Sequence, residues 1–527
     1  MKIESAGSSG GDMTPAPGAE GRRAVVIGSG FGGLAAAVRL SALGWQVQVL
    51  ERLGTPGGRA RVHEIEGFRF DAGPTIVTVP HLFEDLWKLC GRRLADDVQL
   101  VSLDPFYRVR FDDGSWFDYS GDEARMRAEV TRICATDLPG YEAFVREADL
   151  CFREGFEALG STAFRHIGDL IAAVPNMVRM RGWRTIWQMA CKHFKDPKLR
   201  VAFSFHPLLI GGNPRAVTCT YSLINALERR FGVHWAMGGT GSLVRGLVGL
   251  LASRGVPVRL NAEVKRIVVE GGQAKGVLLA SGERVDADIV VSNGDTAWTY
   301  KHLVEPQHRR RWSDAKLDRM HYSMGLFVWY FGTKRRFEDL PHHQIVLGPR
   351  YEGLLEDIFK RHHLSDDFSL YLHRPTATDP QMAPAGCDTF YALSPVPHLD
   401  SGTDWAIAAE GYRASIQRRL EETVMPGLGE SIVVSHVTTP QHFHDELLSY
   451  KGAGFGMEPR LLQSAWFRPH NRSEDVRGLY IVGASGHPGA GVPGVLMSAL
   501  ALETVLPRLG PAAPRPAMPM PAWARRA

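Results

Sequence analysis

Gly28-Ser-Gly30-Phe-Gly-Gly33 lies between a short apolar run and a stretch in which apolar residues recur with helical spacing. The preceding run, Arg23-Ala-Val-Val-Ile27, is rich in β-branched residues, as is typical of a buried parallel strand. The following stretch, Leu34 to Leu43, has Ala, Val and Leu on one face. The sequence therefore predicts a strand, a glycine-rich turn and a helix in immediate succession.

Each glycine of this turn has a physical role in binding a dinucleotide. Gly28 permits a tight turn, Gly30 lets the backbone approach a pyrophosphate, and Gly33 lets the helix pack closely on the strand. The helix N-terminus adds free N–H groups and the positive end of its dipole. A second predicted strand, Gln46 to Leu50, leads to Glu51, whose carboxylate can accept hydrogen bonds from a ribose. Together these features predict dinucleotide binding, against the alternative of a structural turn.

A second glycine turn follows shortly after the acidic residue. Pro56-Gly57-Gly58-Arg59 places a guanidinium near the predicted diphosphate, and the alternative is a loop with a solvated arginine. Glu51-Arg52 followed by Pro-Gly-Gly-Arg resembles the glutathione-reductase-like flavoproteins, which include amine oxidases, protoporphyrinogen oxidases and carotenoid desaturases. This resemblance implies FAD as the cofactor, with Glu51 and Arg59 among its ligands and Asp71-Ala-Gly-Pro74 as the flavin-side loop.

The C-terminal part of the sequence returns to the cofactor. Leu479-Tyr-Ile-Val-Gly483 is typical of a strand ending in glycine, and a helix beginning near Gly494 would aim its N–H groups at the flavin. The intervening His487-Pro-Gly-Ala-Gly-Val-Pro-Gly494 is similar to the signature of bacterial-type phytoene desaturases, and the resemblance extends over nearly the whole chain. It also implies a backbone contact between Val264 and adenine. The residues predicted to bind FAD are Gly28, Gly30, Gly33, Glu51, Arg52, Gly58, Arg59, Asp71, Val264, Gly483, Gly494 and Val495.

The implied fold class is α/β, with a discontinuous, glutathione-reductase-like FAD-binding Rossmann domain and an inserted α+β substrate domain. We assign residues 22–110, 235–295 and 454–507 to the FAD-binding domain. Residues 111–234 and 296–453 are assigned to a substrate domain that faces the membrane. Residues 1–21 and 508–527 have the composition of a disordered leader and a disordered tail.

Composition and spacing exclude several functional classes. A net charge of +4 over 527 residues gives no footprint for nucleic acid. The six cysteines have no CxxC, zinc-finger or iron–sulfur spacing, which indicates reduced thiols in a cytoplasmic protein. Histidine pairs such as His342/His343 lack an HExxH pattern, so they are expected to be surface or loop residues and no metal site is predicted. No apolar stretch reaches the ~18 residues of a membrane-spanning helix.

The resemblance implies desaturation of phytoene, a long hydrocarbon, during carotenoid biosynthesis. Amino-acid side chains cannot accept a hydride, so we expect hydride transfer to FAD and release of the second hydrogen as a proton. Reduced FAD is expected to pass its electrons to a quinone or to oxygen, and ζ-carotene, neurosporene and lycopene are all compatible products. The candidate catalytic residues are Asp169, for which a helix N-terminal charge is the alternative, and His487, whose motif also serves close backbone approach.

Residues 164–194 combine apolar residues and tryptophans with a basic edge. Helical spacing places Ile167, Ile171 and Trp183 among residues such as Arg165 and Arg179. This pattern suits an interfacial helix on a membrane, and it equally suits a helix packed on the core with a solvated basic edge. The membrane interpretation agrees with a membrane-dissolved carotenoid substrate, and it places the protein in the cytoplasm, peripheral on the cytoplasmic membrane.

Two alternative functions stay open at the level of sequence. One is a related carotenoid-modifying flavoenzyme: a later-step carotenoid desaturase, an isomerase or an oxidase. The other is a non-catalytic lipid carrier of the same fold, as in the Rab GDP-dissociation inhibitors. The intact glycine turn, Glu51 and Arg59 argue against a carrier without cofactor.

Overall fold

Two sheets built from distant parts of the chain organise the molecule. The computed structural model describes residues 22–506, 509 and 517–520. The first sheet has five parallel strands in the order β19-β13-β1-β2-β9. These strands are β1 (Arg23–Ile27), β2 (Gln46–Leu50), β9 (Val258–Arg259), β13 (Ile289–Ser292) and β19 (Leu479–Ile481). The predicted first strand is therefore central, and the glycine turn leaves it at the carboxyl edge, where open α/β sheets bind ligands.

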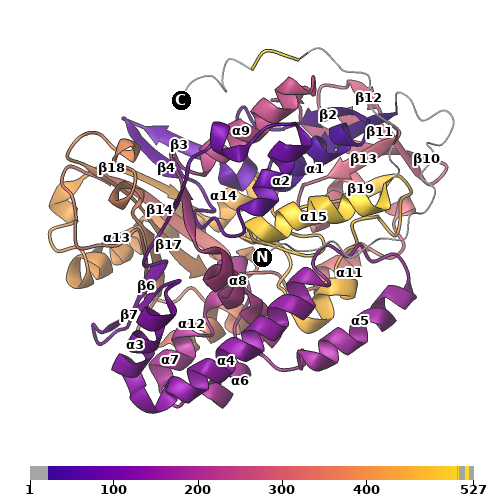
Figure 1. The fold of residues 1–527 in the computed structure, drawn as a ribbon. Coiled ribbons are helices and arrows are strands. Elements are labelled where there is room, and N and C mark those ends of the chain that lie inside the picture. The colour runs from indigo at the N-terminus through magenta and orange to yellow at the C-terminus, as the bar shows by residue number, and fades with distance from the viewer. Residues whose placement is uncertain (1–21, 507–508, 510–516, 521–527) are drawn as a thin grey trace.

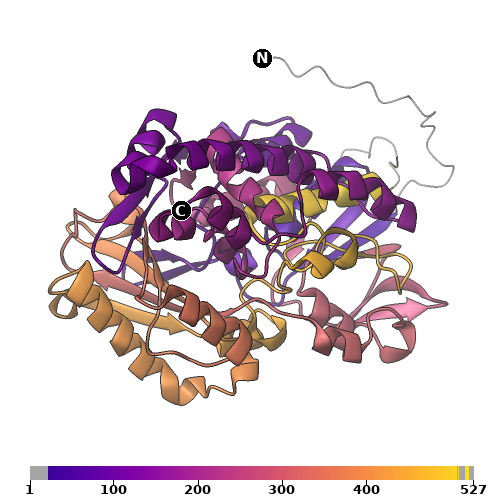
Figure 2. The same ribbon diagram turned by 90° about the horizontal axis from the view of Figure 1, so that it is seen from below.

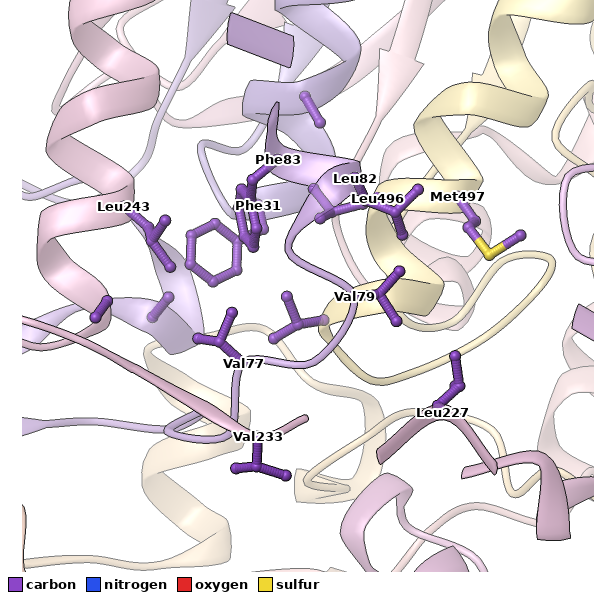
Figure 3. Packing of buried hydrophobic residues seen from close by; sticks show 14 of the residues in the cluster. Phe31, Val77, Val79, Leu82, Phe83, Leu227, Val233, Leu243, Leu496 and Met497 are labelled. Atoms are coloured by element: carbon purple, nitrogen blue, oxygen red, sulfur yellow. The ribbon is translucent and has the colours of Figure 1, made fainter. Parts of the chain in front are cut away.

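The helix after the glycine turn is buried along almost its entire length. It is α1 (Phe31–Ala42), and α2 (His81–Leu89), α9 (Thr240–Ser253) and α15 (Val492–Val505) pack around it. Figure 3 shows Phe31 against Phe83, with their rings edge to face and 5.5 Å between centroids. Leu243 of α9 and Leu496 of α15 complete this part of the core. Such packing fixes the direction in which the helix N-terminus points.

Smaller antiparallel sheets extend this half of the molecule. Three strands, β10 (Val264–Glu270), β11 (Gln273–Leu279) and β12 (Arg284–Asp286), form a sheet that contacts β13. Two further pairs are β3 (Val62–Ile65) with β4 (Phe68–Asp71), and β5 (Leu100–Ser102) with β8 (His234–Ala236).

The seven-stranded sheet forms the other half, in the order β18-β14-β17-β16-β15-β6-β7. Its strands are β6 (Tyr107–Arg110), β7 (Trp116–Tyr119), β14 (Gly325–Thr333), β15 (His343–Val346), β16 (Leu370–His373), β17 (Asp388–Val396) and β18 (Ile432–Thr438). Every residue of β14 is buried, because its side chains alternate between two cores. Leu326 and Val328 join the large central core, while Phe327 and Trp329 pack with residues of α13 (Trp405–Thr423).

A helical layer covers the side of the molecule that Figure 2 shows uppermost. It consists of α3 (Glu123–Cys134), α4 (Leu138–Cys151), α5 (Ile167–Arg179), α6 (Ile186–His193), α7 (Pro197–Ala202) and α8 (Leu223–Phe231). The remaining short helices are α10 (Thr296–Trp298), α11 (Asp314–Arg319), α12 (Tyr351–Glu356) and α14 (Pro440–Asp445). In Figure 1 this layer lies along the bottom, the five-stranded sheet at upper right and α13 at the left.

The fold class predicted from the sequence is confirmed, and two boundaries are corrected. β6 lies inside the segment 22–110 assigned to the FAD-binding domain, yet it pairs with β7 and β15 of the other sheet. Within the tail expected to be disordered, the described residues Leu509 and Met518 donate backbone hydrogen bonds to the carbonyls of Leu43 and Ala252. The expected leader lies outside the described residues. No described helix is both long enough and apolar enough to cross a membrane.

Candidate functional site

A cavity of about 610 Å³ connects the two halves of the molecule. Its lining begins at the glycine turn after β1 and continues to apolar side chains of α5, α8 and the seven-stranded sheet. The predicted cofactor residues in its lining are Gly28, Gly30, Glu51, Arg52, Gly58, Arg59, Val264, Gly494 and Val495, and the candidate catalytic residue His487 is there too. One half of the cavity is thus a polar, glycine-rich edge and the other half is predominantly apolar.

The glycine turn has no room for side chains. Gly28 adopts a φ of +88°, which favours glycine. A Cβ on Gly30 would lie 2.9 Å from Nδ2 of Asn293, and one on Gly33 would lie 2.1 Å from the carbonyl oxygen of Gly28. Gly28 and Gly30 line the cavity, while Gly33 is enclosed between helix and strand. This cradle fits the diphosphate of a dinucleotide, because backbone N–H groups can approach it closely.

Glu51 is held rigidly at the end of β2. Its Oε2 accepts hydrogen bonds from the backbone N–H of Ser29 (2.8 Å) and from the Ser29 hydroxyl (2.6 Å), and its Oε1 accepts one from the backbone N–H of Leu53 (2.9 Å). A carboxylate has about four acceptor positions, so capacity remains for a ligand hydroxyl. Val264 is the first residue of β10, and it lines the same cavity as Glu51. Both placements suit an adenosine moiety.

The two arginines among the predicted cofactor residues have different hydrogen-bond partners. Arg59 donates from Nε to the carbonyl of Gly454 (2.8 Å), hydrogen-bonds Ser449 Oγ, and lies near the buried carboxylate of Asp295. Burial lowers the pKa of Arg59, and the Asp295 charge opposes this. Arg52 lines the cavity, but its guanidinium donates to the carbonyls of Glu446 (2.8 Å) and Asp445 (3.1 Å). We therefore expect Arg52 to hold the cavity wall and Arg59 to face the cofactor.

Three predicted cofactor residues lie outside the cavity lining and act on the fold around it. Gly33 allows the close packing described above. Asp71 accepts hydrogen bonds from the backbone N–H of Thr240 at the start of α9 (3.1 and 3.2 Å). Burial raises the pKa of Asp71 to about 6, and the Thr240 bonds oppose this. A Cβ on Gly483 would lie 2.6 Å from Oδ1 of Asn293, so this glycine permits close packing behind the turn.

The C-terminal loop presses its backbone and His487 against the cavity. A Cβ on Gly494 would lie 2.6 Å from the carbonyl oxygen of Gly489. His487 is 3% exposed, packs edge to face on Phe164, and neither ring nitrogen has a hydrogen-bond partner among the described residues. Burial, followed by the Arg468 charge, lowers the pKa of His487 to about 3. The ring is therefore neutral, and its proposed catalytic role stays a prediction.

Asp169 occupies the position that the alternative interpretation describes. It lies in the first turn of α5, and its Oδ2 accepts hydrogen bonds from the backbone N–H groups of Arg165 (2.6 Å) and His166 (3.0 Å). These bonds lower the pKa of Asp169. Its neighbour Leu170 lines the cavity, whereas Asp169 does not. This geometry is that of a carboxylate that stabilises the N-terminus of a helix.

Sequence reasoning missed polar residues that the fold brings to the cavity. Asn293 follows β13 at the carboxyl edge of the sheet, and this position after a parallel strand was a usable signal. Thr75, just beyond the flavin-side loop, lies 2.9 Å from the hydroxyl of Tyr371 and 3.1 Å from that of Tyr391. Glu228 of α8 also lines the cavity. Thr75, Tyr371, Tyr391 and Glu228 come from segments that are far apart in the sequence, and no local motif predicts their proximity.

The expectation for His342 and His343 is wrong, because both are buried. His343 pairs with His373 between β15 and β16, and both are buried. Together with His342 they form a group in which one ring nitrogen of each histidine lies within 4.8 Å of one ring nitrogen of the other two. Burial lowers the pKa of all three. Among the described residues this is the group that could hold a metal ion. The three rings are neutral, with partners such as the Tyr371 hydroxyl, 2.7 Å from His343 Nδ1.

Comparison with known proteins agrees with this arrangement. The sequence profile described as "Flavin containing amine oxidoreductase" matches residues 31–501. A neurosporene-forming phytoene desaturase of Cereibacter sphaeroides is 51% identical over 95% of this chain and 96% of that protein. A lycopene-forming phytoene desaturase of Pseudescherichia vulneris is 45% identical over 92% of this chain and 99% of that protein.

Solved structures with low sequence identity share the fold. A putrescine oxidase bound to putrescine has 15% identity and a TM-score of 0.62, and the alignment covers 92% of this chain and 97% of the oxidase. An oxidoreductase from Methanosarcina mazei has 19% identity and a TM-score of 0.63, with 92% and 100% covered. These two likenesses support the fold alone.

Proposed function

The chain belongs to the family of flavin-containing amine oxidoreductases, and we propose that within it the protein is an FAD-dependent phytoene desaturase of carotenoid biosynthesis. The observation that carries this proposal is the cavity, in which a dinucleotide cradle continues directly into a predominantly apolar space. A hydrocarbon substrate offers no polar group for recognition, so its site must be apolar and shaped. The enzyme is thus an oxidoreductase acting on CH–CH groups.

FAD fits the polar half of the cavity. The turn from Gly28 to Gly30 would hold the diphosphate, Glu51 the ribose, Val264 the adenine through its backbone, and the Gly494 loop the flavin. Bound FAD supplies the two-electron acceptor that amino-acid side chains lack. Arg59, close to Asp295, places a positive charge at the same wall.

The apolar half of the cavity would hold the hydrocarbon chain. Its walls come from α5 and α8 in the helical layer and from β14, β15, β16 and β17 in the seven-stranded sheet. The lining includes Leu170, Ala173, Met177, Leu208, Leu223, Leu227, Leu326, Val328, Ile345 and Leu370. These side chains exclude water from the reacting carbons and fix the substrate by shape, because burial of apolar surface is favourable along its whole length.

Membrane association is the finer part of the proposal, and α5 supports it. Leu170, Ala173 and Met177 line the cavity from one face of this helix. Its other apolar face is exposed, with 60% of Ile167 and 65% of Ile171 open to solvent. Apolar residues beside arginines suit a helix at the surface of a bilayer. We place the protein in the cytoplasm, peripheral on the cytoplasmic membrane, where a carotenoid can pass into the cavity beside α5.

The electron acceptor and the product complete the proposal. A quinone dissolved in the same membrane, or molecular oxygen, would reoxidise the cofactor. Neurosporene and lycopene are the proposed products, since relatives of both kinds cover nearly the whole chain. A later-step carotenoid desaturase is the second candidate, because an all-trans-ζ-carotene desaturase of Myxococcus xanthus is 30% identical over 94% of this chain.

Expression in a bacterial strain that accumulates phytoene tests the function. We expect phytoene to disappear and coloured carotenoids to appear by chromatography, with the longest chromophore giving the number of desaturation steps. The matched strain without this gene should keep its phytoene. Unchanged phytoene in the presence of folded, yellow protein would contradict the proposal, and conversion of supplied ζ-carotene in the same experiment would then favour the later-step enzyme.

A further inference from the structure

One wall of the apolar half of the cavity, the proposed substrate half, includes a buried acidic residue, Glu228. On α8, the cavity is lined by four residues: Leu223, Ile224, Leu227 and Glu228. Their spacing along the helix puts them on one face. Three of the four are apolar, and Glu228 is 1% exposed. An acid placed on an otherwise apolar wall costs free energy, which indicates a chemical use.

Other carboxylates of the cavity lining are engaged elsewhere. Glu51 is bound by Ser29 and Leu53, and Asp295 accepts from the Ser485 hydroxyl and faces Arg59. Glu263 and Glu446 are half exposed and form ion pairs with Arg52 (3.3 Å) and Arg61 (2.8 Å).

Glu228 differs from these acids in its partners. Its Oε2 accepts a hydrogen bond from the hydroxyl of Tyr107 (2.6 Å) and lies 3.5 Å from Nε2 of His206. Within the described part of the chain, no lysine or arginine forms an ion pair with it. The carboxylate is therefore held by neutral hydrogen-bonding groups and not by an ion pair with a lysine or arginine.

The groups behind Glu228 form a short hydrogen-bonded path. Burial and the Glu228 charge raise the pKa of Tyr107 well above its usual value, so the phenol keeps its proton and donates it. The same hydroxyl lies 2.9 Å from Nε2 of His206, which is fully buried. Asn225, one turn before Glu228 on α8, donates to the neighbouring Tyr119 hydroxyl (3.0 Å). A proton received by the carboxylate therefore has polar groups next to it.

We propose that Glu228 is the catalytic base that removes the proton in each desaturation. This inference rests on the proposed function, which supplies FAD as the oxidant. One carbon of the substrate loses hydrogen with its bonding electron pair. The C–H bond of the adjacent carbon then breaks, its electrons form the new C=C bond, and its proton goes to the Glu228 carboxylate. The resulting carboxylic acid passes this proton toward the neighbouring His206 before the next step.

The chemistry requires only a modest base in this position. A C–H bond next to an electron-deficient allylic carbon is acidic, so a carboxylate suffices. Water, the other acceptor, is excluded by the apolar walls of Leu223, Ile224 and Leu227. Asp169, one candidate acceptor from the sequence, lies outside this lining and accepts hydrogen bonds from the two backbone N–H groups just before α5.

The variant Glu228→Gln tests the assignment. Glutamine keeps the size of the side chain and a carbonyl oxygen for the Tyr107 hydroxyl, and it removes the basicity. We expect normal flavin content, phytoene retained in the purified protein, and phytoene consumption about 100-fold slower, the scale of a lost general base. Glu228→Asp should recover part of the rate. Glu142→Gln, which removes an acid from the exposed face of α4, should behave as the unmodified protein.

A second variant separates catalysis from structure. Tyr107→Phe removes the hydroxyl that Glu228 accepts from and leaves the carboxylate. A catalytic base predicts a much smaller loss of rate for Tyr107→Phe than for Glu228→Gln. Equal losses in the two variants, or an undiminished rate in Glu228→Gln, would overturn the assignment. If the unmodified protein itself leaves phytoene unchanged, the proposed function fails first, and that outcome is distinguishable in the same experiment.

Discussion

The two halves of one cavity are built by different physical means. The cofactor half is made of backbone: Gly28 has a positive φ, and Gly30 and Gly494 bring main-chain atoms to the surface where side chains would not fit. The substrate half is made of side chains, from α5, α8 and four strands of the other sheet. A backbone site needs particular residues at fixed spacing, whereas an apolar wall needs only volume and hydrophobicity. We therefore expect a single added side-chain atom to disturb the cofactor half, whereas the substrate half should tolerate exchanges between apolar residues of similar volume.

Gly30→Val should break the cofactor half most severely. A Cβ at this position would already lie 2.9 Å from Asn293 Nδ2, and the added methyls would fill the approach to the diphosphate. We expect the purified variant to lose at least ~90% of its bound flavin, which corresponds to ~1.4 kcal/mol or more of binding free energy. The ratio of visible flavin absorption to protein absorption measures this. A variant that retains as much flavin as the unmodified protein would contradict the assignment of this glycine turn as the diphosphate site.

Ala173→Trp sharpens the contrast in the substrate half. Ala173 is 4% exposed and lines the cavity from α5, so an indole there would occupy substrate space. Overfilling costs about 1–3 kcal/mol, so we expect desaturation to fall ~10- to 100-fold with flavin content unchanged. Chromatography of carotenoids, together with flavin quantification, checks both parts. Loss of flavin in this variant would show that the halves are not separable.

Ile171→Glu tests the outer face of the same helix. Ile171 is 65% exposed, and burying an isoleucine in a bilayer surface contributes about 1.5–3 kcal/mol. We expect binding to phospholipid vesicles, measured by co-flotation, to weaken ~10-fold or more. Ile407→Glu is the matched control, because Ile407 is 80% exposed on α13, on the opposite side of the seven-stranded sheet. Equal weakening in both variants would argue against a specific membrane face.

The smallest predicted effect is a loss of folding stability at low pH. Burial lowers the pKa of His487 to about 3, against an ordinary value of 6.5. Below pH 6.5 the unfolded chain binds a proton that the folded protein refuses, so stability is lost as pH falls toward 3. At pH 5.5 this amounts to about 1.4 kcal/mol. Denaturant unfolding at pH 7.5 and 5.5 should show a smaller difference in His487→Gln. An identical pH response in that variant would contradict a buried neutral imidazole.

The same contrast explains what the sequence could predict. The cofactor half follows from local spacing, and β1, the turn, β2 and Glu51 occupy the predicted places. Two of the predicted cofactor residues also have protein partners: Asp71 accepts hydrogen bonds from Thr240 at the start of α9, and Arg52 donates to the carbonyls of Glu446 and Asp445.

The substrate half depends on long-range packing, which local spacing does not encode. Glu228, Tyr107 and His206 meet across segments more than twenty residues apart, with one separation of 121 residues. His342 and His343 were expected to be surface or loop residues, yet both are buried, and His343 pairs with His373 between β15 and β16. The alternative for Asp169, a helix N-terminal charge, agrees with the structure, where the backbone N–H groups of Arg165 and His166, just before α5, donate to its carboxylate.

The central claim is that one cavity holds both FAD and phytoene. The most direct measurement is a single turnover without oxygen, in which phytoene in liposomes is added to the purified flavoprotein. We predict that the visible flavin absorption bleaches while one double bond forms per flavin reduced, and that oxygen or a quinone restores the absorption. Persistent flavin absorption over phytoene that remains unchanged would contradict the account.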